Sequence, residues 1–267
     1  MRVWRPTPFI LGSVILHLVA VVYILFEPAQ WLWAVGVIAL NQAFIFAACL
    51  WPQGSLLEDN LARLPDAAIQ RGEIALTFDD GPDPNITPKV LAILAEHGVK
   101  ASFFLIGMRA TAHLELCRNI VAAGHTIENH GQLHRIRNAF FGLRGWMKEV
   151  GDGQSTLESI TGRRPQFYRA LAGFRNPFLA PVLNRHGIRL ASWTRRGYDT
   201  ITTDAEVVLA RLVKNLAAGD ILLLHDGNSA KTASGNSVVL EVLPRLLQEI
   251  SNKKLSPVTL PSACNPN

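Results

Sequence analysis

The sequence predicts an α/β fold in which about seven parallel strands form a distorted (β/α) barrel, preceded by a two-helix transmembrane hairpin. Three observations lead to this prediction. Two uncharged apolar runs stand near the N-terminus. From residue 73 onward, short apolar stretches alternate with amphipathic ones, which is typical of a parallel sheet covered by helices. Polar residues follow several of the expected strands, where such folds carry their chemistry.

Composition excludes several classes of protein. The chain has 267 residues, of which 49% are hydrophobic and 18% charged, so it has ample apolar mass for a core and is not disordered. Its three cysteines are far apart and lie outside any C-x-x-C pattern, which excludes a disulfide scaffold. The net charge of +5 would suit an anionic lipid surface. The basic residues are scattered, and we expect no nucleic-acid partner.

Residues 1–51 are predicted to form the membrane hairpin. The first uncharged run, 9–26, would reach about 27 Å as a helix, which is roughly the thickness of the bilayer core. A break at 27–30 separates it from the second run, 31–51. Tryptophans stand at the ends of the runs, where interfacial aromatic residues belong. A signal peptide is disfavoured because no small-residue cleavage site separates the runs.

Residues 52–71 read as a polar linker, and residues 72–267 as the catalytic domain. Glycines just past several expected helices are typical of left-handed C-caps. The expected strands are 73–79, 101–106, 126–129, 166–170, 189–193, 220–225 and 257–260. The expected helices are 87–97, 109–123, 143–161, 178–186, 205–217 and 238–252.

Two clusters at strand ends suggest a metal site. The run TFDDGP places Asp79 and Asp80 at the end of the first barrel strand, and His130 and His134 follow the third. One carboxylate and two imidazoles, with positions left open for water, form a known catalytic metal set. Each cluster alone has an ordinary reading, as an Asp-Gly turn or as surface histidines.

Charged residues at other strand ends complete a hydrolytic set. His225 ends the strand ILLLH and could act as an acid or base near neutral pH, while Arg169 and Asp199 end two further strands. A metal would lower the pKa of bound water and polarise a carbonyl, and a second Asp would take the proton from that water. An arginine would keep the base ionised, and an aspartate would keep the histidine cationic.

Five segments in this order resemble the polysaccharide deacetylase family, carbohydrate esterase family 4 with its NodB homology domain. They are TFDDGPD at 77–83, GHTIENHGQLH at 124–134, FYRALAGFRNP at 167–177, WTRRGYD at 193–199 and ILLLHDG at 221–227. The resemblance covers roughly residues 72–260 and implies a distorted (β/α) barrel, often with seven strands. It also implies metal-dependent hydrolysis of the linear amide bond of N-acetylated amino sugars.

The resemblance also assigns roles by position. Asp79 resembles the catalytic base, Arg169 the arginine that tethers it, His225 the general acid and Asp199 the aspartate that orients that acid. Leu223 takes the apolar position of the acetyl pocket, and the backbone N–H of Ala172 could serve as an oxyanion donor. The implied metal ligands are Asp80, His130 and His134. Zinc is the expected ion, with cobalt, nickel and manganese as alternatives.

Some positions depart from the family pattern. Gly131 replaces the usual Ser or Thr after the first metal histidine, so we expect one loop hydrogen bond to be lost. Ala170, Leu171 and Ala172 follow the arginine in place of two prolines and an aromatic or histidine residue. Arg196 stands where an aspartate is common, and Thr200 replaces a tryptophan. Because the catalytic set is intact, we interpret these changes as altered substrate choice.

The expected function is removal of an N-acyl group, acetyl by default, from a lipid-linked or precursor amino sugar at the membrane. A deacetylase of a wall or exported polymer is the alternative, and another amide such as a formamide is a weaker one. The alternative from another class is a non-catalytic, membrane-tethered glycan-binding protein.

Charge around the apolar runs predicts the orientation. Arg2 and Arg5 precede the first run, and Arg63 and Arg71 follow the second, whereas the turn at 27–30 has no basic residue. The positive-inside rule therefore places a multi-pass protein in the inner membrane with its catalytic domain in the cytoplasm. If the second run does not span the bilayer, the domain is periplasmic and a polymer substrate is favoured.

Overall fold

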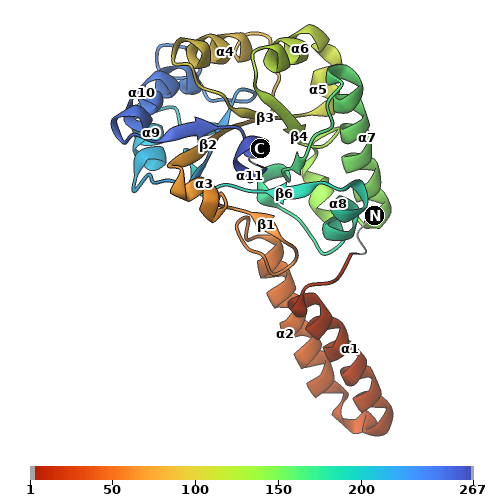
Figure 1. Cartoon of the computed structure of the whole chain (residues 1–267). Helices are drawn as coiled ribbons and strands as arrows, with labels where there is room; N and C mark the ends of the chain where they lie inside the picture. The colour runs from red at the N-terminus through yellow and green to blue at the C-terminus, as the bar shows by residue number, and fades with distance from the viewer. Residues whose placement is uncertain (1–3, 266–267) are drawn as a thin grey trace.

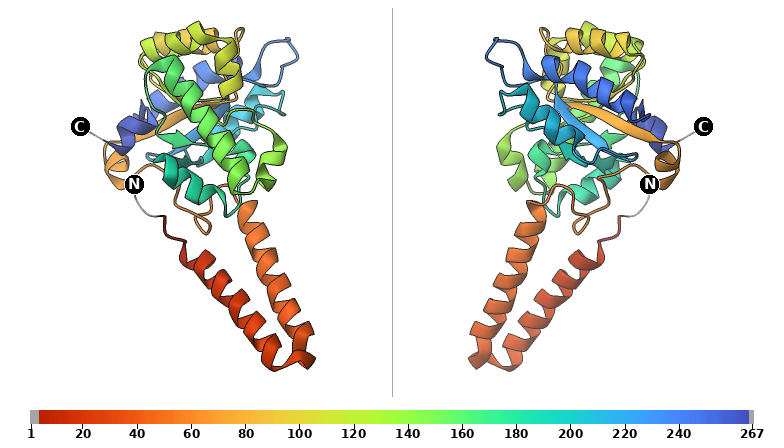
Figure 2. Two further views of the ribbon diagram at one scale, coloured as in Figure 1. Left: turned by 90° about the vertical axis from the view of Figure 1, so that its right-hand side faces the viewer. Right: turned by 90° about the vertical axis from the view of Figure 1, so that its left-hand side faces the viewer.

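Two antiparallel helices project from one side of an α/β barrel in the computed structural model, which describes residues 4–265 (Figure 1). The helices are α1 (Pro8–Phe26) and α2 (Trp31–Cys49), joined by the short 3₁₀ helix η1 (Pro28–Gln30). Both are long and apolar enough to cross a membrane. Figure 2 shows that they diverge as they approach the barrel. Arg2, on which part of the expected orientation depends, lies outside the described residues.

Polar side chains hold the two helices together. The amide of Asn41 donates to Ser13 Oγ at 2.7 Å, and Gln42 Nε2 lies 3.0 Å from His17 Nε2. These contacts match the preference of polar groups in apolar helices for a partner helix over lipid. They also fix the register of α1 against α2.

The barrel sheet contains nine strands in the described part of the chain, and every strand pair is parallel. Its hydrogen-bonded order is β1-β6-β5-β4-β3-β2-β8-β7, with β9 also paired to β2. The strands are β1 (Asn60–Leu61), β2 (Glu73–Asp79), β3 (Ser102–Leu105), β4 (Thr126–Asn129), β5 (Phe167–Tyr168), β6 (Arg189–Ala191), β7 (Arg195–Arg196), β8 (Ile221–His225) and β9 (Ser256–Val258). The predicted curled, parallel (β/α) architecture is confirmed. Seven of the nine strands coincide with expected ones.

The two unexpected strands, β1 and β7, help to curl the sheet. β6 and β7 are separated by three residues, so one extended segment pairs with β5 at its start and with β8 at its end. That segment brings the two sides of the sheet together. β7 consists of two arginines and carries no apolar alternation, which is why the hydrophobic pattern did not predict it.

Strand β2 shows how the barrel separates its core from its site. Ile74, Leu76 and Phe78 are buried under the outer helices. Ala75 belongs to the interior cluster, and Asp79 ends the strand at the barrel mouth. The alternation follows from the two-residue period of a strand.

The helices around the sheet are α4 (Thr87–Glu96), α5 (Gly107–Ala112), α6 (Leu114–Ala122), α7 (Leu143–Thr161), α8 (Leu179–His186), α9 (Ala205–Val213) and α10 (Val238–Asn252), with short α3 (Asp66–Gln70) and α11 (Leu260–Cys264).

The segment expected to be a linker lies within the barrel. Strand β1 pairs with β6, and Leu57, Leu61 and Leu64 of this segment are buried. Burial of these apolar side chains and the ladder hydrogen bonds favour a packed segment over a free one. A single helix was expected at 109–123, but the structure has two, α5 and α6. They are separated at His113, whose φ of −135° and ψ of 54° are not helical.

Candidate active site

The carboxyl ends of four strands bring together the polar residues that the sequence singled out. Asp79 is the last residue of β2, and His225 is the last residue of β8. His130 directly follows β4, and Arg169 directly follows β5. Parallel strands end at the same edge of a sheet, so residues from distant parts of the chain meet at one mouth.

Asp80, His130 and His134 form a group that could hold a metal ion. One ligand atom from each lies within 4.8 Å of the others. Asp80 Oδ1 is 3.3 Å from His130 Nε2 and 3.1 Å from His134 Nε2, so one carboxylate oxygen faces both rings. The other oxygen, Oδ2, accepts a hydrogen bond from Asn228 at 3.0 Å. This arrangement leaves one carboxylate oxygen and two ring nitrogens directed at a common point.

The protonation chemistry of this group fits a cation. His134 Nε2 is buried and has no hydrogen-bond partner, despite its closeness to Asp80. Burial and the neighbouring His130 lower the pKa of His134 to about 3, so its ring is neutral at neutral pH. The pKa of His130 is raised, because Asp79 and Asp80 outweigh its burial. A bound cation would displace that proton, as metal binding to histidine requires.

Arg169 connects the base position to the rest of the barrel. Its guanidinium is fully buried and donates to Asp79 Oδ1 at 2.7 Å and to Thr77 Oγ1 at 2.8 Å. It also donates to the carbonyls of Ala191 and Ser192. Asp79 Oδ2 is left facing His130 Nε2 at 3.8 Å. The pairing therefore leaves Oδ2 of Asp79 directed toward the candidate metal group.

His225 and Asp199 form a second pair at the mouth. Asp199 Oδ1 lies 2.8 Å from His225 Nδ1, and Asp199 Oδ2 accepts from the backbone N–H of His225 at 2.7 Å. Burial would lower the pKa of His225, but Asp199 outweighs it and the pKa is raised. With Nδ1 engaged, Nε2 is the ring atom free to exchange a proton with another molecule.

The remaining expected site residues lie nearby. Leu223 is buried in the interior cluster, two residues before His225. Ala172 belongs to the 3₁₀ turn η3 (Leu171–Gly173) and has a φ of 51°, a left-handed value that is uncommon for alanine. The turn begins two residues after Arg169, and its Leu171 lines the same pocket as His130 and His134.

Glu149 of α7 is a site residue that the sequence did not reveal. Its Oε1 accepts from the backbone N–H groups of Leu133 and His134, at 2.8 Å and 2.9 Å. His134 has a left-handed φ of 53°, and these two bonds hold it there. A Cβ on Gly131 would lie 2.7 Å from the same Oε1, so the glycine makes room for the carboxylate. The loop hydrogen bond expected to be lost at Gly131 is thus compensated by Glu149, and Asn129 Oδ1 accepts from Gly131 N–H at 2.7 Å.

Arg109 and Asn228 were also missed. Arg109 donates to the backbone oxygen of Asp80 and, at 2.9 Å, to Asn228 Oδ1. Asn228 in turn holds Asp80 Oδ2, as described above. Asp80 has a left-handed φ of 69°, and these contacts fix its backbone and side chain. Neither residue belongs to a recognisable motif, because their roles arise from contacts across the barrel mouth.

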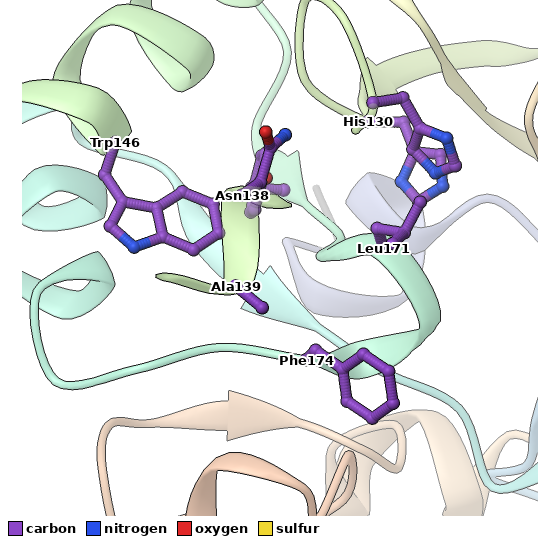
Figure 3. Close-up of a pocket in the computed structure, with 8 residues that line it drawn as sticks. His130, Asn138, Ala139, Trp146, Leu171 and Phe174 are labelled. Carbon is purple, nitrogen blue, oxygen red and sulfur yellow. The ribbon is translucent and has the colours of Figure 1, made fainter. Parts of the chain in front are cut away.

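His130 and His134 also line a narrow pocket at the barrel mouth (Figure 3). The 3₁₀ helix η2 (Ile136–Phe140) supplies Asn138 and Ala139 on one side, and the η3 loop supplies Leu171 and Phe174 on the other. Trp146 of α7 also lines it, on the side of Asn138. The candidate metal group therefore has an apolar wall on one side.

We predict that Glu149 sets the affinity of the site for a divalent ion. Glu149→Ala removes the acceptor of two loop amides and should weaken zinc binding about 10-fold or more, as loss of a group that orients a ligand does. Glu149→Gln keeps one acceptor oxygen and should lie between the alanine variant and the wild type. Zinc titration of metal-stripped protein measures both. His134→Ala is the reference for loss of a ligand, and wild-type affinity in Glu149→Ala would contradict this role.

Comparisons with known proteins agree with the geometry. The family model described as polysaccharide deacetylase matches residues 67–191. The peptidoglycan-N-acetylglucosamine deacetylase of Bacillus cereus is 31% identical over 178 residues, which are 66% of this chain and 82% of that protein. The chitooligosaccharide deacetylase of Azorhizobium caulinodans is 34% identical over 158 residues, 59% of this chain and 75% of that protein.

A solved deacetylase structure has the same fold as this chain. The Bc1960 peptidoglycan N-acetylglucosamine deacetylase, in complex with a hydroxamate, superposes with a TM-score of 0.69 and 26% identity. The match covers 77% of this chain and 92% of that one. Together with the motifs at the barrel mouth, these likenesses show that the chain belongs to the polysaccharide deacetylase family, carbohydrate esterase family 4.

Proposed function

We propose that this protein is a metal-dependent hydrolase that removes an N-acetyl group from an amino sugar carried on a lipid-linked or precursor glycan at the membrane. The observation that carries the reaction type is the pairing at the barrel mouth. Asp79 is held by Arg169 and His225 by Asp199, and both pairs adjoin Asp80, His130 and His134. The peptidoglycan and chitooligosaccharide deacetylases named above support an N-acetylated glycan as the substrate class.

Asp80, His130 and His134 would hold the divalent ion. Zinc is a known partner of one carboxylate and two imidazoles in hydrolases and is the default, with cobalt, nickel and manganese as alternatives. When bound, the ion supplies a Lewis acid that polarises the amide carbonyl and acidifies water. Asn228 and Glu149 keep the ligand atoms in place.

The protein's own groups would move the protons. Asp79 Oδ2, the oxygen that Arg169 leaves free, takes a proton from the attacking water. His225 Nε2 donates a proton to the sugar nitrogen as the C–N bond breaks, while Asp199 fixes the ring through Nδ1. Leu223 provides an apolar surface for the acyl methyl group, and the Ala172 N–H donates to the oxyanion.

Two features support a substrate close to the bilayer. The side chain of Arg175, just after the η3 loop, donates to the carbonyls of Trp51, Pro52 and Gly54, directly beyond the end of α2. Asn176 then donates to the carbonyls of Ala139 and Phe141 at η2. The apolar wall of the site is thereby tied to the base of the hairpin.

The second feature is the surface of η2 itself. Ile136 and Phe140 are 74% and 82% exposed, which is unusual for such large apolar side chains near a catalytic site. Arg135 and Arg137 flank Ile136 in the sequence. Exposed apolar residues beside arginines suit the interface of an anionic bilayer. This placement favours a lipid-linked sugar over a distant polymer.

The function is tested by the acid and base variants. Asp79→Asn and His225→Ala should each lower kcat for release of acetate from N-acetylated sugars by about 10²-fold or more, because each removes one proton-transfer group. Folding is checked by thermal unfolding of the detergent-solubilised chain. Wild-type rates in both variants would place the chemistry elsewhere. A wild type without activity on lipid-linked and polymeric N-acylated sugars would favour the non-catalytic, glycan-binding alternative.

The pH profile should depend on Asp199. His225 acts as an acid only when protonated, so kcat falls as pH rises through its raised pKa. Asp199→Asn removes the charge that raises this pKa, and the alkaline limb of the profile should move to lower pH. Kinetics across the alkaline range measure the shift. An unmoved limb in a variant that retains measurable activity would mean that His225 is not the titrating acid.

The catalytic domain should lie in the cytoplasm. Arg5 precedes α1, and Arg63 and Arg71 follow α2, so both flanks of the hairpin carry positive charge. Alkaline phosphatase fused after Asn267 should be inactive, and green fluorescent protein at the same position should fluoresce. Strong phosphatase activity would place the domain outside and favour a wall or exported polymer as the substrate.

A further inference from the structure

Arg196 occupies the barrel mouth without a role in the site described above. It is the last residue of β7 and pairs in register with Leu223 of β8. The side chain of its neighbour Arg195 points to the outer side of the sheet. There it contacts Asp220 at 2.5 Å. Successive side chains of a strand alternate between faces, so Arg196 is on the interior face, the face of Leu223.

Aromatic rings hold the Arg196 guanidinium near the reaction centre. Its Cζ lies 5.4 Å from the ring centre of Trp193 and 4.9 Å from that of Tyr198. The same Trp193 ring lies 5.9 Å from Cζ of Arg169. The guanidinium groups of Arg196 and Arg169 therefore both contact the indole of Trp193. Arg169 in turn binds Asp79.

Arg196 lacks an anionic partner within residues 4–265. No carboxylate lies within ion-pair distance of it, and its buried Nε makes no hydrogen bond. Two acids of the barrel mouth are already engaged, Asp79 by Arg169 and Asp199 by His225. Its charge also acts on Arg169, whose pKa is lowered first by burial and further by Arg196. A half-buried, unpaired cation beside another cation is costly unless an anion joins them.

The geometry suits recognition of an oxyanion. Stacking on aromatic faces fixes the plane of a guanidinium while its N–H edge stays available for hydrogen bonds. That edge matches phosphate and carboxylate in a bidentate manner. Tyr198 is 46% exposed, so the stacked pair is accessible from solvent at the mouth.

We propose that Arg196 forms an anion-binding subsite that recognises a phosphate or carboxylate carried next to the acylated amino sugar. The assignment rests on the proposed function, because the anion belongs to the same substrate. It selects anionic sugars over neutral glycans. Two kinds of substrate could supply such an oxyanion: a lipid-linked sugar through its anomeric phosphate, and an acidic sugar through its carboxylate.

The first test compares three N-acetylated sugars of similar size. Methyl N-acetylglucosaminide is neutral, N-acetylglucosamine 1-phosphate carries the anomeric phosphate, and N-acetylmuramic acid carries a carboxylate. In Arg196→Gln, the ratio of kcat/KM for an anionic sugar to that for the neutral one should fall about 10-fold or more, mainly through KM. Arg163→Gln removes an equal charge at an exposed position before β5, at the opposite end of the barrel, and should keep the wild-type ratio.

The result also separates the two sources. A loss confined to the phosphate sugar assigns the subsite to a lipid-linked type of substrate, and a loss confined to N-acetylmuramic acid assigns it to an acidic sugar. Unchanged ratios in Arg196→Gln, with all three sugars hydrolysed, overturn the subsite and leave the proposed function standing.

Equilibrium binding decides the proposal independently of turnover. Calorimetry on the full Asp79→Asn chain in detergent measures binding of the same three sugars, with and without Arg196→Gln. The added substitution should weaken binding of the phosphate or carboxylate sugar about 10-fold or more relative to the neutral sugar. Equal weakening of all three, or none, would contradict an anion subsite even if no sugar is hydrolysed. Failure of the wild type to hydrolyse any sugar would count against the proposed function alone.

Discussion

The buried side chain and carbonyl of Arg169 are the constraint on which the rest of the site depends. The guanidinium binds Asp79 and Thr77 of β2, and the carbonyls of Ala191 and Ser192 where the extended segment 189–196 turns toward β8. Its own backbone oxygen lies 2.8 Å from His130 Nδ1. One residue thus fixes the base, one candidate metal ligand and the point where the sheet curls together. Removing it would leave a buried carboxylate unpaired, which is among the costliest changes a core can undergo.

The residues at the centre of the barrel mouth pair with one another, and the departures from the family pattern lie around them. The inner residues satisfy one another: Asp79 with Arg169, His225 with Asp199, and Asp80 with Asn228. The departures from the family pattern lie around them, at Gly131, Arg196 and the Ala170–Leu171–Ala172 run. Gly131 is coupled to Glu149, and Arg196 stacks on Trp193.

The sequence revealed the centre of the site because its residues stand directly at strand ends, where periodicity can be read. The apolar run before Asp79 and the one before His225 predict both the strands and the mouth. Glu149, Arg109 and Asn228 could not be predicted, since each acts through contacts with residues far away in the chain. β1 and β7 were missed because Asn60–Leu61 and Arg195–Arg196 lie outside any apolar run, unlike the equally short Phe167–Tyr168 of β5. The polar composition of segment 52–71 predicted a linker, whereas Leu57, Leu61 and Leu64 are buried and β1 pairs with β6.

The central claim is that the mouth hydrolyses an amide bond of an amino sugar, and isotope incorporation tests it most directly. Detergent-solubilised protein loaded with zinc is incubated with N-acetylglucosamine 1-phosphate and chitooligosaccharide in water enriched in oxygen-18. The released acetate should carry one new oxygen-18 atom and the sugar should gain a free amine, and both products should form at least about 10²-fold more slowly with Asp79→Asn. Absence of labelled acid from both sugars and from lipid-linked N-acylated sugars would contradict the claim, as would equal release by Asp79→Asn.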